Sequence, residues 1–369
     1  MNAKLNVGVL GCGIISGIYL ETMKKFPMLN VAACADIDIT RSEQRATEYQ
    51  IPKVCSVKEM LSDKDIQIIL NLTIPKVHAE VSLDILSAGK HLYSEKPLGI
   101  SYTEATTIIA AAEKAGLRVG CAPDTVLGTG VQTSRRLIDD GWIGKPVSGT
   151  AFMAGHGPEG WHTNPFFYYD IGGGPVFDMG PYYLSALITL LGPVHRVFSH
   201  TGITYPERMA TTSVHFCKKI EVKTATHITG LLEFANGAVI TVIFSFDVWA
   251  HHLPHIEIFG SEGSLNVPDP NTFSGPVLIK RQATTDWKES ALLAPYLGSN
   301  YRGLGVADMA QGILLKQPHR ANGQVALHVT DIMESLLESG KKESWVTLRS
   351  TCEQPAAMPA TAVAIGQLG

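Results

Sequence analysis

The sequence predicts an α/β protein of two domains, in which a doubly wound parallel sheet precedes a second α/β domain with a large, mostly antiparallel, open-faced sheet. Short apolar runs alternate with helical patterns as far as residue 122, as in a parallel sheet with helical crossovers. From residue 194 the apolar period changes to two, which is typical of antiparallel strands. A chain of 369 residues also exceeds one ordinary core. We therefore expect domains at 1–123 and 124–349, followed by an Ala- and Pro-rich tail at 350–369.

Composition favours a cytoplasmic protein that acts on a small molecule. The net charge is −4, and Lys and Arg are scattered without the basic runs that follow a nucleic-acid backbone. The six cysteines are widely spaced and form no CxxC pair, which is typical of reduced thiols in the cytosol. The amino end leaves no room for a cleavable apolar segment, and no run of about 18 apolar residues follows. Nucleic-acid and membrane partners are therefore not expected.

A glycine-rich turn joins the first strand to the first helix. Residues 5–10 form a Val-rich apolar run, after which Gly11 permits a tight turn and Gly13 lets the backbone approach a pyrophosphate. A second strand at residues 30–35 ends at Asp36, close to the spacing at which a carboxylate accepts hydrogen bonds from ribose hydroxyls. This arrangement predicts NAD as cofactor and disfavours NADP, because Asp36 would repel a 2′-phosphate. The candidate cofactor contacts here are Gly11, Gly13, Ile14, Ile15 and Asp36.

Two further strands end in candidate cofactor contacts. The apolar run at residues 66–72 is of the kind buried on both faces of a parallel sheet. The next strand, at residues 90–94, ends in Glu95 and Lys96, where Pro97 terminates it. Ligands of open α/β sheets bind outside the carboxyl ends of the strands, so this charged pair is expected to face a ligand; a surface ion pair is the alternative. The candidate cofactor contacts at these strand ends are Thr73, Ile74, Pro75, His78, Glu95 and Lys96.

An aromatic stretch at residues 156–170 follows a strand of the second domain. Rings with polar tips suit a sugar or polyol, since the rings cover apolar faces while the tips meet hydroxyls. A satellite hydrophobic cluster under a long loop is the alternative. The candidate substrate contacts are Trp161 and Tyr168 from this stretch, Asp124 from the domain junction, and Asp178 and Lys96.

Three glycines at 172–174 precede a helix that ends near residue 191. Asp178, Tyr182 and Ser185 lie at i, i+4 and i+7 and so share one face of this helix, which is either its solvent face or part of a site. Farther along, Asn236-Gly237 predicts a hairpin, and a second hairpin is expected around residues 261–263. The histidines at 251, 252 and 255 match no common zinc pattern, and no metal is expected.

Five motifs in order resemble the Gfo/Idh/MocA oxidoreductases over roughly residues 5–345. They are GCGIIS at 11–16, EKP at 95–97, GWIGKP at 141–146, GGG with DMGPY within 172–182, and GSEGSL at 260–265. The resemblance implies a Rossmann domain plus an open-faced α/β domain, NAD(P) at the first glycine turn, and hydride transfer to or from a sugar, polyol or related carbohydrate. It also implies that Lys96 lies beside the nicotinamide and the substrate hydroxyl. The family's DxGxHxxD motif departs here, with Tyr182 in place of His and Ser185 in place of the last Asp.

The proton carrier has more than one candidate. Oxidation of a secondary alcohol needs a base for the hydroxyl proton. Tyr182 would need a neighbouring cation to act near neutral pH, because a free tyrosine titrates near 10, and Lys96 is placed to supply it. Asp178 would then hold a second hydroxyl or fix Lys96, and His162 is the reserve candidate for the base.

Two other classes of function share these motifs. A redox-assisted glycosidase would oxidise a sugar transiently with tightly held NAD and regenerate it, and only a net change in absorbance at 340 nm separates it from a dehydrogenase. A non-catalytic NAD sensor would be expected to lack Lys96, which is present.

We also expect a homodimer or homotetramer formed through the open sheet.

Overall fold

A parallel sheet of five strands forms the first domain, in agreement with the prediction of a doubly wound sheet. The computed structural model describes residues 4–293 and 300–359. The strand order is β2-β1-β3-β4-β5, and all four neighbouring pairs are parallel. The strands are β1 (Leu5–Leu10), β2 (Leu29–Ala35), β3 (Ile68–Asn71), β4 (His91–Ser94) and β5 (Val119–Cys121). The helices are α1 (Ser16–Met23), α2 (Ile39–Tyr49), α3 (Val57–Ser62), η1 (Pro75–Val77), α4 (His78–Ser87) and α5 (Tyr102–Ala115).

Both faces of this sheet are buried, which explains its continuous apolar runs. Val7 and Val9 pack in one apolar cluster together with Leu20 of α1. Leu10 and other residues of the opposite face pack in a second cluster with Ile85 of α4 and with α5. Alternate residues of one strand thus serve two cores, as a sheet covered by helices on both sides requires.

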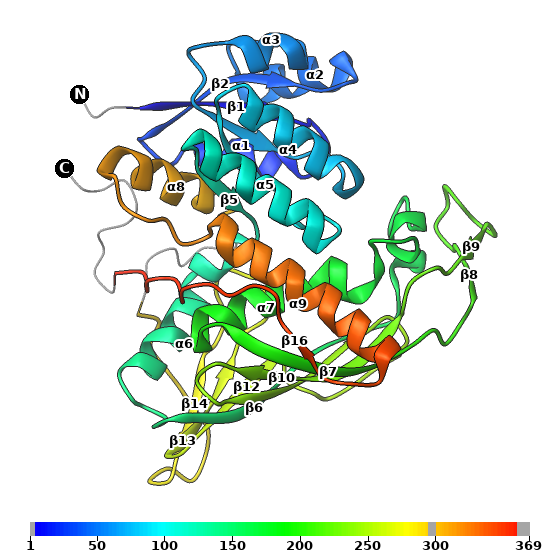
Figure 1. Cartoon of the computed structure of the whole chain (residues 1–369), viewed down its shortest axis with the longest axis vertical. Coiled ribbons are helices and arrows are strands. Elements are labelled where there is room, and N and C mark those ends of the chain that lie inside the picture. The colour runs from blue at the N-terminus through cyan, green and yellow to red at the C-terminus, as the bar shows by residue number, and fades with distance from the viewer. Residues whose placement is uncertain (1–3, 294–299, 360–369) are drawn as a thin grey trace.

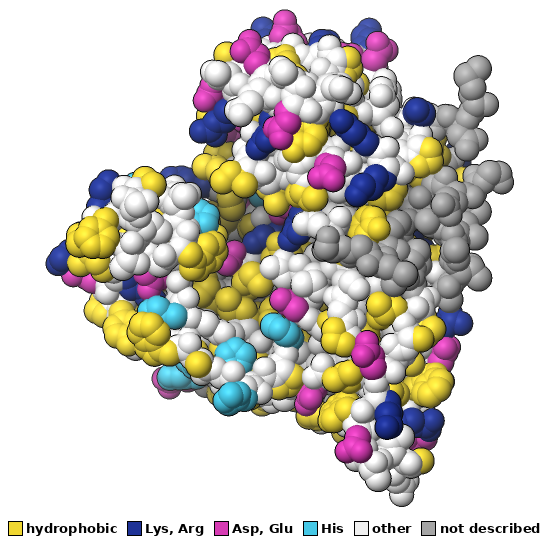
Figure 2. Space-filling model, turned by 180° about the vertical axis from the view of Figure 1, so that it is seen from behind, with side chains coloured by type: hydrophobic (Ala, Val, Ile, Leu, Met, Phe, Trp, Pro, Cys, Tyr) yellow, Lys and Arg dark blue, Asp and Glu magenta, His cyan; other side chains and the backbone are white. Residues whose placement is uncertain are grey.

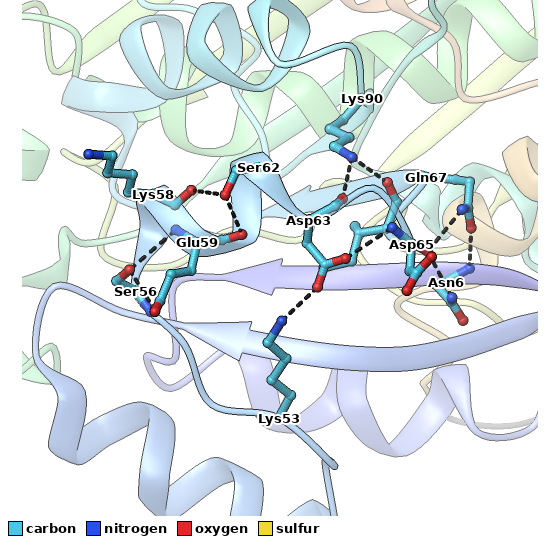
Figure 3. Close-up of polar contacts among 11 residues, drawn as sticks. Asn6, Lys53, Ser56, Lys58, Glu59, Ser62, Asp63, Asp65, Gln67 and Lys90 are labelled. Carbon is cyan, nitrogen blue, oxygen red and sulfur yellow. Dashed lines mark hydrogen bonds and ion pairs between the residues drawn. The ribbon is translucent and has the colours of Figure 1, made fainter.

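Polar contacts fix the loops at the amino ends of the first-domain strands (Figure 3). The backbone N–H of Asn6 donates to Gln67 Oε1 at 2.9 Å, which joins the starts of β1 and β3. Lys90, just before β4, donates to the carbonyl oxygens of Asp63 and Ile66. These contacts therefore lie at the amino ends of the strands. The candidate cofactor contacts lie at the opposite, carboxyl ends.

The second domain is built on a mixed sheet of nine strands. Its order is β15-β14-β13-β12-β6-β11-β10-β7-β16, in which β6 and β11 are parallel and the other neighbours antiparallel. Both predicted hairpins are present, as β10 with β11 and β12 with β13. The strands are β6 (Pro146–Ala154), β7 (Val194–Gly202), β10 (His227–Phe234), β11 (Val239–Ser245), β12 (Ile256–Gly260), β13 (Gly263–Val267), β14 (Leu278–Arg281), β15 (Lys288–Glu289) and β16 (Val346–Thr347).

Helices cover one face of the large sheet and leave the other bare (Figure 1). Ile228 and Ile240 point into the covered core, whereas Leu231 and Thr241, on the opposite face, are half-buried. The prediction of an open-faced sheet is therefore confirmed. The remaining elements are η2 (Asp124–Leu127), α6 (Thr129–Asp139), η3 (Pro158–Gly160), η4 (Phe166–Tyr169), α7 (Gly174–Leu191), α8 (Leu304–Leu315), α9 (Gly323–Lys342) and a small hairpin of β8 (Glu207–Met209) and β9 (Lys219–Glu221).

The chain returns to the first domain after the large sheet. Helix α8 packs against α1 and β5, and α9 contacts α5 and β5 as well as α7 and β7. Residues far apart in the sequence thereby hold the two domains together, and the predicted boundary at residue 123 stays a prediction.

The described part of the C-terminal tail lies against α6, α7 and the segment before α9. Gln354 donates to the carbonyl oxygen of Thr189 at 3.0 Å, and the N–H of Met358 donates to Gln132 Oε1 at 2.8 Å. Arg320 Nε donates to the carbonyl oxygen of Ala356 at 3.0 Å. Residues 360–369 of the predicted tail lie outside the described residues.

Candidate active site

The glycine turn after β1 has one glycine pressed against protein and one facing open space. Gly11 has φ +102°, and a β-carbon there would lie 2.6 Å from the carbonyl oxygen of Leu72, so only glycine fits. A β-carbon at Gly13 would meet no atom within 4 Å. Ser16 opens α1, and its hydroxyl donates to the carbonyl oxygen of Gly13 at 2.7 Å. The turn thus leaves room for a ligand at the start of α1, as a bound pyrophosphate requires.

Asp36 lies beside this turn. Its Oδ2 accepts from the N–H of Cys12 at 2.7 Å, and its Oδ1 accepts from the N–H of Asp38 at 2.9 Å. Arg45 of α2 donates to the carbonyl oxygen of Gly13 at 3.2 Å and pairs with Glu48. Sequence analysis did not select Arg45, because it lies in the middle of a helix and belongs to no motif.

Apolar side chains are exposed at the carboxyl ends of the first three strands. Ile14, Ile37 and Ile74 are 89%, 100% and 65% exposed, respectively. Ile15, Thr73 and Pro75 are half-buried beside them. Large exposed aliphatic groups are costly unless something covers them, and the rings of a dinucleotide fit this position. Sequence analysis did not select Ile37. Its position directly after Asp36 could have indicated that it lies near the cofactor.

His78 is buried and links two predicted cofactor segments. Its Nδ1 lies 2.7 Å from the carbonyl oxygen of Pro97, and its Nε2 lies 2.9 Å from that of Thr73. Burial lowers the pKa of His78, although both carbonyl contacts oppose this. The ring therefore fixes the segments after β3 and β4 relative to each other and does not itself reach the open side.

Lys96 connects the first domain to α7. Its Nζ donates to the backbone oxygen of Asp178 at 2.6 Å and to Oδ1 of the same residue at 3.2 Å. It also lies 5.1 Å from the centre of the Tyr182 ring. Glu95 holds the segment, since it accepts from Tyr19 Oη and from the N–H of Lys96, both at 2.8 Å. Burial alone would lower the pKa of Lys96, but Asp178, Tyr182 and Glu95 raise it, so the ammonium stays charged at neutral pH.

The aromatic stretch contributes Tyr168 to the same place. Burial raises the pKa of Tyr168 to about 12, with Asp178 adding to the rise and Lys96 opposing it. His162 lies behind this ring, at 5.1 Å between centres, and its Nδ1 accepts from the N–H of Asn164 at 3.0 Å. Trp161 contacts His162 edge-on and is 66% exposed. The structure thus brings Tyr168 to Lys96 and places His162 and Trp161 farther out.

Asp124 is not brought to the open part of this site. It is 1% exposed, and its Oδ2 accepts from the N–H groups of Gly303 (2.7 Å) and Gly305 (3.0 Å) at the start of α8. Burial raises its pKa to about 6, against the effect of those two N–H groups. These hydrogen bonds give Asp124 a structural role at the start of α8, so its presence can be explained without a substrate contact.

Arg302 is a residue of the site that sequence analysis missed. It precedes α8, and its guanidinium interacts with the phenol of Tyr182 and with Tyr19. Burial lowers the pKa of Arg302, but Tyr182, Tyr19 and Asp124 together outweigh this, so the pKa is raised. No pattern around residue 302 indicated a site, because only the return of the chain to the first domain brings it there.

An open hollow and a small internal cavity lie at the meeting of the domains. Figure 2 shows the hollow between the first domain and the lobe that carries β8 and β9, with yellow hydrophobic walls and dark blue cationic groups deep inside. A cavity of about 20 Å³ lies behind Lys96 and is also lined by Ser185, Thr189 and Thr330. It has room for about one water molecule. Ser185 of α7 thus faces this cavity.

The fold and the site define a dinucleotide-dependent oxidoreductase. The open glycine turn, the carboxylate at the end of β2 and the exposed aliphatic groups fit a dinucleotide, and the Lys96 pair lies where its reactive end would meet a substrate. Residues 5–122 match the model of an oxidoreductase family with an NAD-binding Rossmann fold, and residues 131–266 match the Gfo/Idh/MocA C-terminal domain. The chain belongs to the Gfo/Idh/MocA family of NAD-binding oxidoreductases.

Relatives of known name extend over most of the chain. Inositol 2-dehydrogenase of Burkholderia cenocepacia is 25% identical over 77% of this chain and 81% of its own length. Trans-1,2-dihydrobenzene-1,2-diol dehydrogenase of Bos taurus is 22% identical over 93% of this chain and 98% of its own length. The structure of levoglucosan dehydrogenase with NADH and levoglucosan superposes with a TM-score of 0.79 at 20% identity, covering 94% of this chain and 99% of that one. This last likeness concerns the fold.

Proposed function

We propose that the protein is an NAD-dependent oxidoreductase that moves a hydride between the nicotinamide and a secondary hydroxyl of a sugar, polyol or glycoside. The observation that carries this is the contact of Lys96 with Asp178, which brings the polar face of α7 to the carboxyl end of β4. Relatives named for inositol and levoglucosan support a carbohydrate as substrate.

Each side chain around Lys96 has a separate role in the proposed reaction. When bound, NAD would supply the hydride acceptor, and Gly11, Gly13 and Asp36 would hold it. Lys96 stays cationic and therefore orients the substrate hydroxyl rather than taking its proton. Tyr182, in its phenolate form, accepts that proton on its oxygen and becomes a neutral phenol. Asp178 fixes Lys96, so the Asp178 carboxylate has less capacity to hold a second substrate hydroxyl.

Tyr182 is preferred to His162 as the base because of position. Lys96 lies next to the Tyr182 ring, whereas the Tyr168 ring contacts His162. The aromatic rings of Tyr168 and Trp161 then cover the apolar faces of the sugar.

Assembly and location are part of the proposal. The bare face of the nine-stranded sheet is placed to pair with a second copy, giving a homodimer or homotetramer. The six cysteines are all free thiols, which supports a cytoplasmic location. In the described part of the chain, no helix is both long and apolar enough to cross a membrane.

A substrate screen tests the function. Purified protein with NAD⁺ is mixed with sugars, inositols and glycosides while absorbance at 340 nm is followed. We expect a lasting rise with at least one of them. Cleavage of a glycoside without a net rise would assign the recycling glycosidase reaction instead. NAD binding with no conversion of any carbohydrate would contradict both and favour a sensor.

A further inference from the structure

A buried ion cluster lies in the second domain, apart from the contacts of Lys96. The Nη1 of Arg208, on β8, donates to Glu159 Oε1 at 2.7 Å, and its Nη2 donates to Asp247 Oδ1. The side chains of Arg208, Glu159 and Asp247 are 3%, 9% and 6% exposed, respectively. One guanidinium thus joins three segments that are far apart in the sequence: β8, η3 and the residues after β11.

The second oxygen of each carboxylate in this cluster is also used. Asp247 Oδ2 accepts from the hydroxyls of Thr204 (2.6 Å) and Thr226 (2.7 Å), and Glu159 Oε2 accepts from the hydroxyl of Tyr169. The guanidinium also lies 5.2 Å from the centre of the Tyr169 ring. Desolvation offsets much of the attraction within a buried ion cluster, whereas the demand for one geometry remains. The cluster therefore fixes the positions of the segments that supply it.

The cluster holds both ends of the aromatic stretch. Glu159 lies two residues before Trp161, and Tyr169 directly follows Tyr168. The carbonyl oxygen of Glu159 also accepts from the N–H of Thr211, just after β8, at 3.0 Å. The stretch is thus attached at each end to the lobe that carries β8 and β9 (Figure 1).

The same stretch packs against the segments that carry the Lys96 pair. Gly172 and Gly173 directly precede α7. A β-carbon at Gly173 would lie 2.5 Å from the carbonyl oxygen of Phe167, and one at Gly172 would lie 3.2 Å from Ile100, four residues after Lys96. A shift of the stretch would therefore move its rings relative to Lys96.

We propose that Arg208 is a positioning residue for carbohydrate binding, which holds the aromatic stretch in place so that Trp161 and Tyr168 meet the sugar ring. This rests on the proposed function, in which these rings cover the apolar faces of the sugar. Lys96 and Asp178 contact each other directly, so their pairing does not depend on Arg208. Loss of Arg208 should therefore weaken substrate binding and leave the hydride step nearly intact.

Steady-state kinetics with an oxidised carbohydrate test this split. Arg208→Met should raise KM for the carbohydrate at least ~10-fold, while kcat and the Kd for NAD stay within ~3-fold. Arg208→Lys should recover part of the loss. Arg349→Met is the matched control, because Arg349 pairs with the buried Asp331 of α9 and should leave KM unchanged. An unchanged KM in Arg208→Met, or a loss confined to kcat, would overturn the proposal.

Removal of a ring tests whether the effect of Arg208 passes through the stretch. In a Trp161→Ala background, Arg208→Met should raise KM less than ~5-fold, because one of the positioned rings is already gone. Trp142→Ala is the control background, since Trp142 is also exposed but lies before the opposite end of β6. There the full ~10-fold effect should remain. An equal effect in both backgrounds would show that Arg208 does not act through Trp161.

Hydrogen exchange gives a readout that needs no carbohydrate. With NAD⁺ present, amides of residues 157–170 should exchange at least ~10-fold faster in Arg208→Met than in the parent protein, while those of α7 keep the parent rate. In Arg349→Met the faster exchange should be confined to residues near 344–350. Parent-like exchange of residues 157–170 in Arg208→Met would show that the cluster does not hold the stretch.

The outcomes separate this proposal from the function itself. If the parent protein oxidises no carbohydrate, the proposed function fails, while hydrogen exchange still decides whether Arg208 holds the stretch. If the parent protein is active and KM does not respond to Arg208→Met, the function stands and the role of Arg208 is refuted.

A milder variant keeps the proposal testable if Arg208→Met does not fold by circular dichroism. Tyr169→Phe removes only the hydroxyl that joins the stretch to Glu159, and it should raise KM at least ~3-fold. An unchanged KM in both Tyr169→Phe and Arg208→Lys would then overturn the proposal.

Discussion

Lys96 and Asp178 show how a single contact constrains the roles of neighbouring groups. The pair joins two domains and is half-buried, so the charge of Lys96 is retained where burial alone would disfavour it. A cation that does not release its proton at neutral pH is a poor base but a good donor to a hydroxyl. Under the proposed function the base is then another group. Of the two tyrosines near Lys96, Tyr168 has a pKa that burial raises to about 12, so Tyr182 is the better candidate.

Substitution at Tyr182 and His162 tests that assignment. Tyr182→Phe removes one hydroxyl, so we expect an intact fold and NAD affinity with turnover reduced by ~10² or more. His162→Ala should reduce turnover less than ~10-fold, because His162 lies behind Tyr168. Steady-state kinetics on both variants give the answer. Near-normal Tyr182→Phe with inactive His162→Ala would move the proton path into the aromatic stretch.

Asp36 is expected to set the choice between NAD and NADP. Its carboxylate lies at the glycine turn, so we predict a preference for NAD of at least ~10-fold in kcat/KM, about 1.4 kcal/mol. Asp36→Ser should shrink that ratio, whereas Asp38→Ser, which removes a nearby carboxylate paired with Arg41 and keeps a side chain that can cap α2, should not. Equal use of both cofactors by the parent protein would refute the role given to Asp36, and Arg45 beside Gly13 would then be the first residue to examine.

At the scale of elements, local sequence patterns predicted the individual strands, turns and helices. Long-range packing decided which of these elements contact one another. The glycine turn, the strand ends and the Asn236-Gly237 hairpin were readable because each depends on a few adjacent residues. The parallel pairing of β6 with β11 and the contact of α8 with β5 join segments about 90 residues or more apart, which no local period encodes. Arg302 was missed for the same reason.

The start of α8 offers a prediction about stability. Asp124→Asn keeps an oxygen for the N–H groups of Gly303 and Gly305 and removes a buried charge, whereas Asp124→Ala leaves both donors unpaired. The folded pKa of Asp124 is raised to about 6, so its contribution is present at pH below about 4 and is lost as pH rises through 6. At pH 7.5 we expect Asp124→Asn to match or exceed the parent protein, by about 3 kcal/mol at most, and Asp124→Ala to lose about 1–3 kcal/mol.

Urea unfolding at pH 4.5 and 7.5 checks this expectation. Any advantage of Asp124→Asn should shrink at the lower pH, where the carboxyl group of the parent protein is protonated. If Asp124→Asn is as unstable at pH 7.5 as Asp124→Ala, then the carboxylate charge itself is needed at α8.

For the whole molecule, two sheets face each other across a layer of helices, and the far side of the larger sheet is left bare (Figure 1). Leu231 on β10 and its cross-strand neighbour Thr241 on β11 lie on that bare face. A second layer on this face would bury its half-exposed apolar groups. Stacking of two copies would do so without touching the hollow between the domains.

Assembly through the sheet can be broken by one charge. We predict that the parent protein sediments as a dimer or tetramer and that Leu231→Glu sediments as a monomer, since a buried unpaired carboxylate is costly. Thr103→Glu, at an exposed position in the first turn of α5 in the first domain, is a suitable control. Analytical ultracentrifugation of the three proteins decides, and a Leu231→Glu variant that keeps the parent's oligomeric state would place the interface elsewhere.

The most direct measurement of the central claim compares turnover with cofactor affinity in Lys96→Ala. If Lys96 orients the reacting hydroxyl, kcat falls by ~10² or more while the Kd for NAD, measured by calorimetry, stays within ~3-fold. Lys76→Ala, at an exposed lysine of η1, controls for loss of a positive charge on the cofactor side. Normal turnover together with weakened NAD binding would contradict the account, because Lys96 would then serve the cofactor and not the reaction.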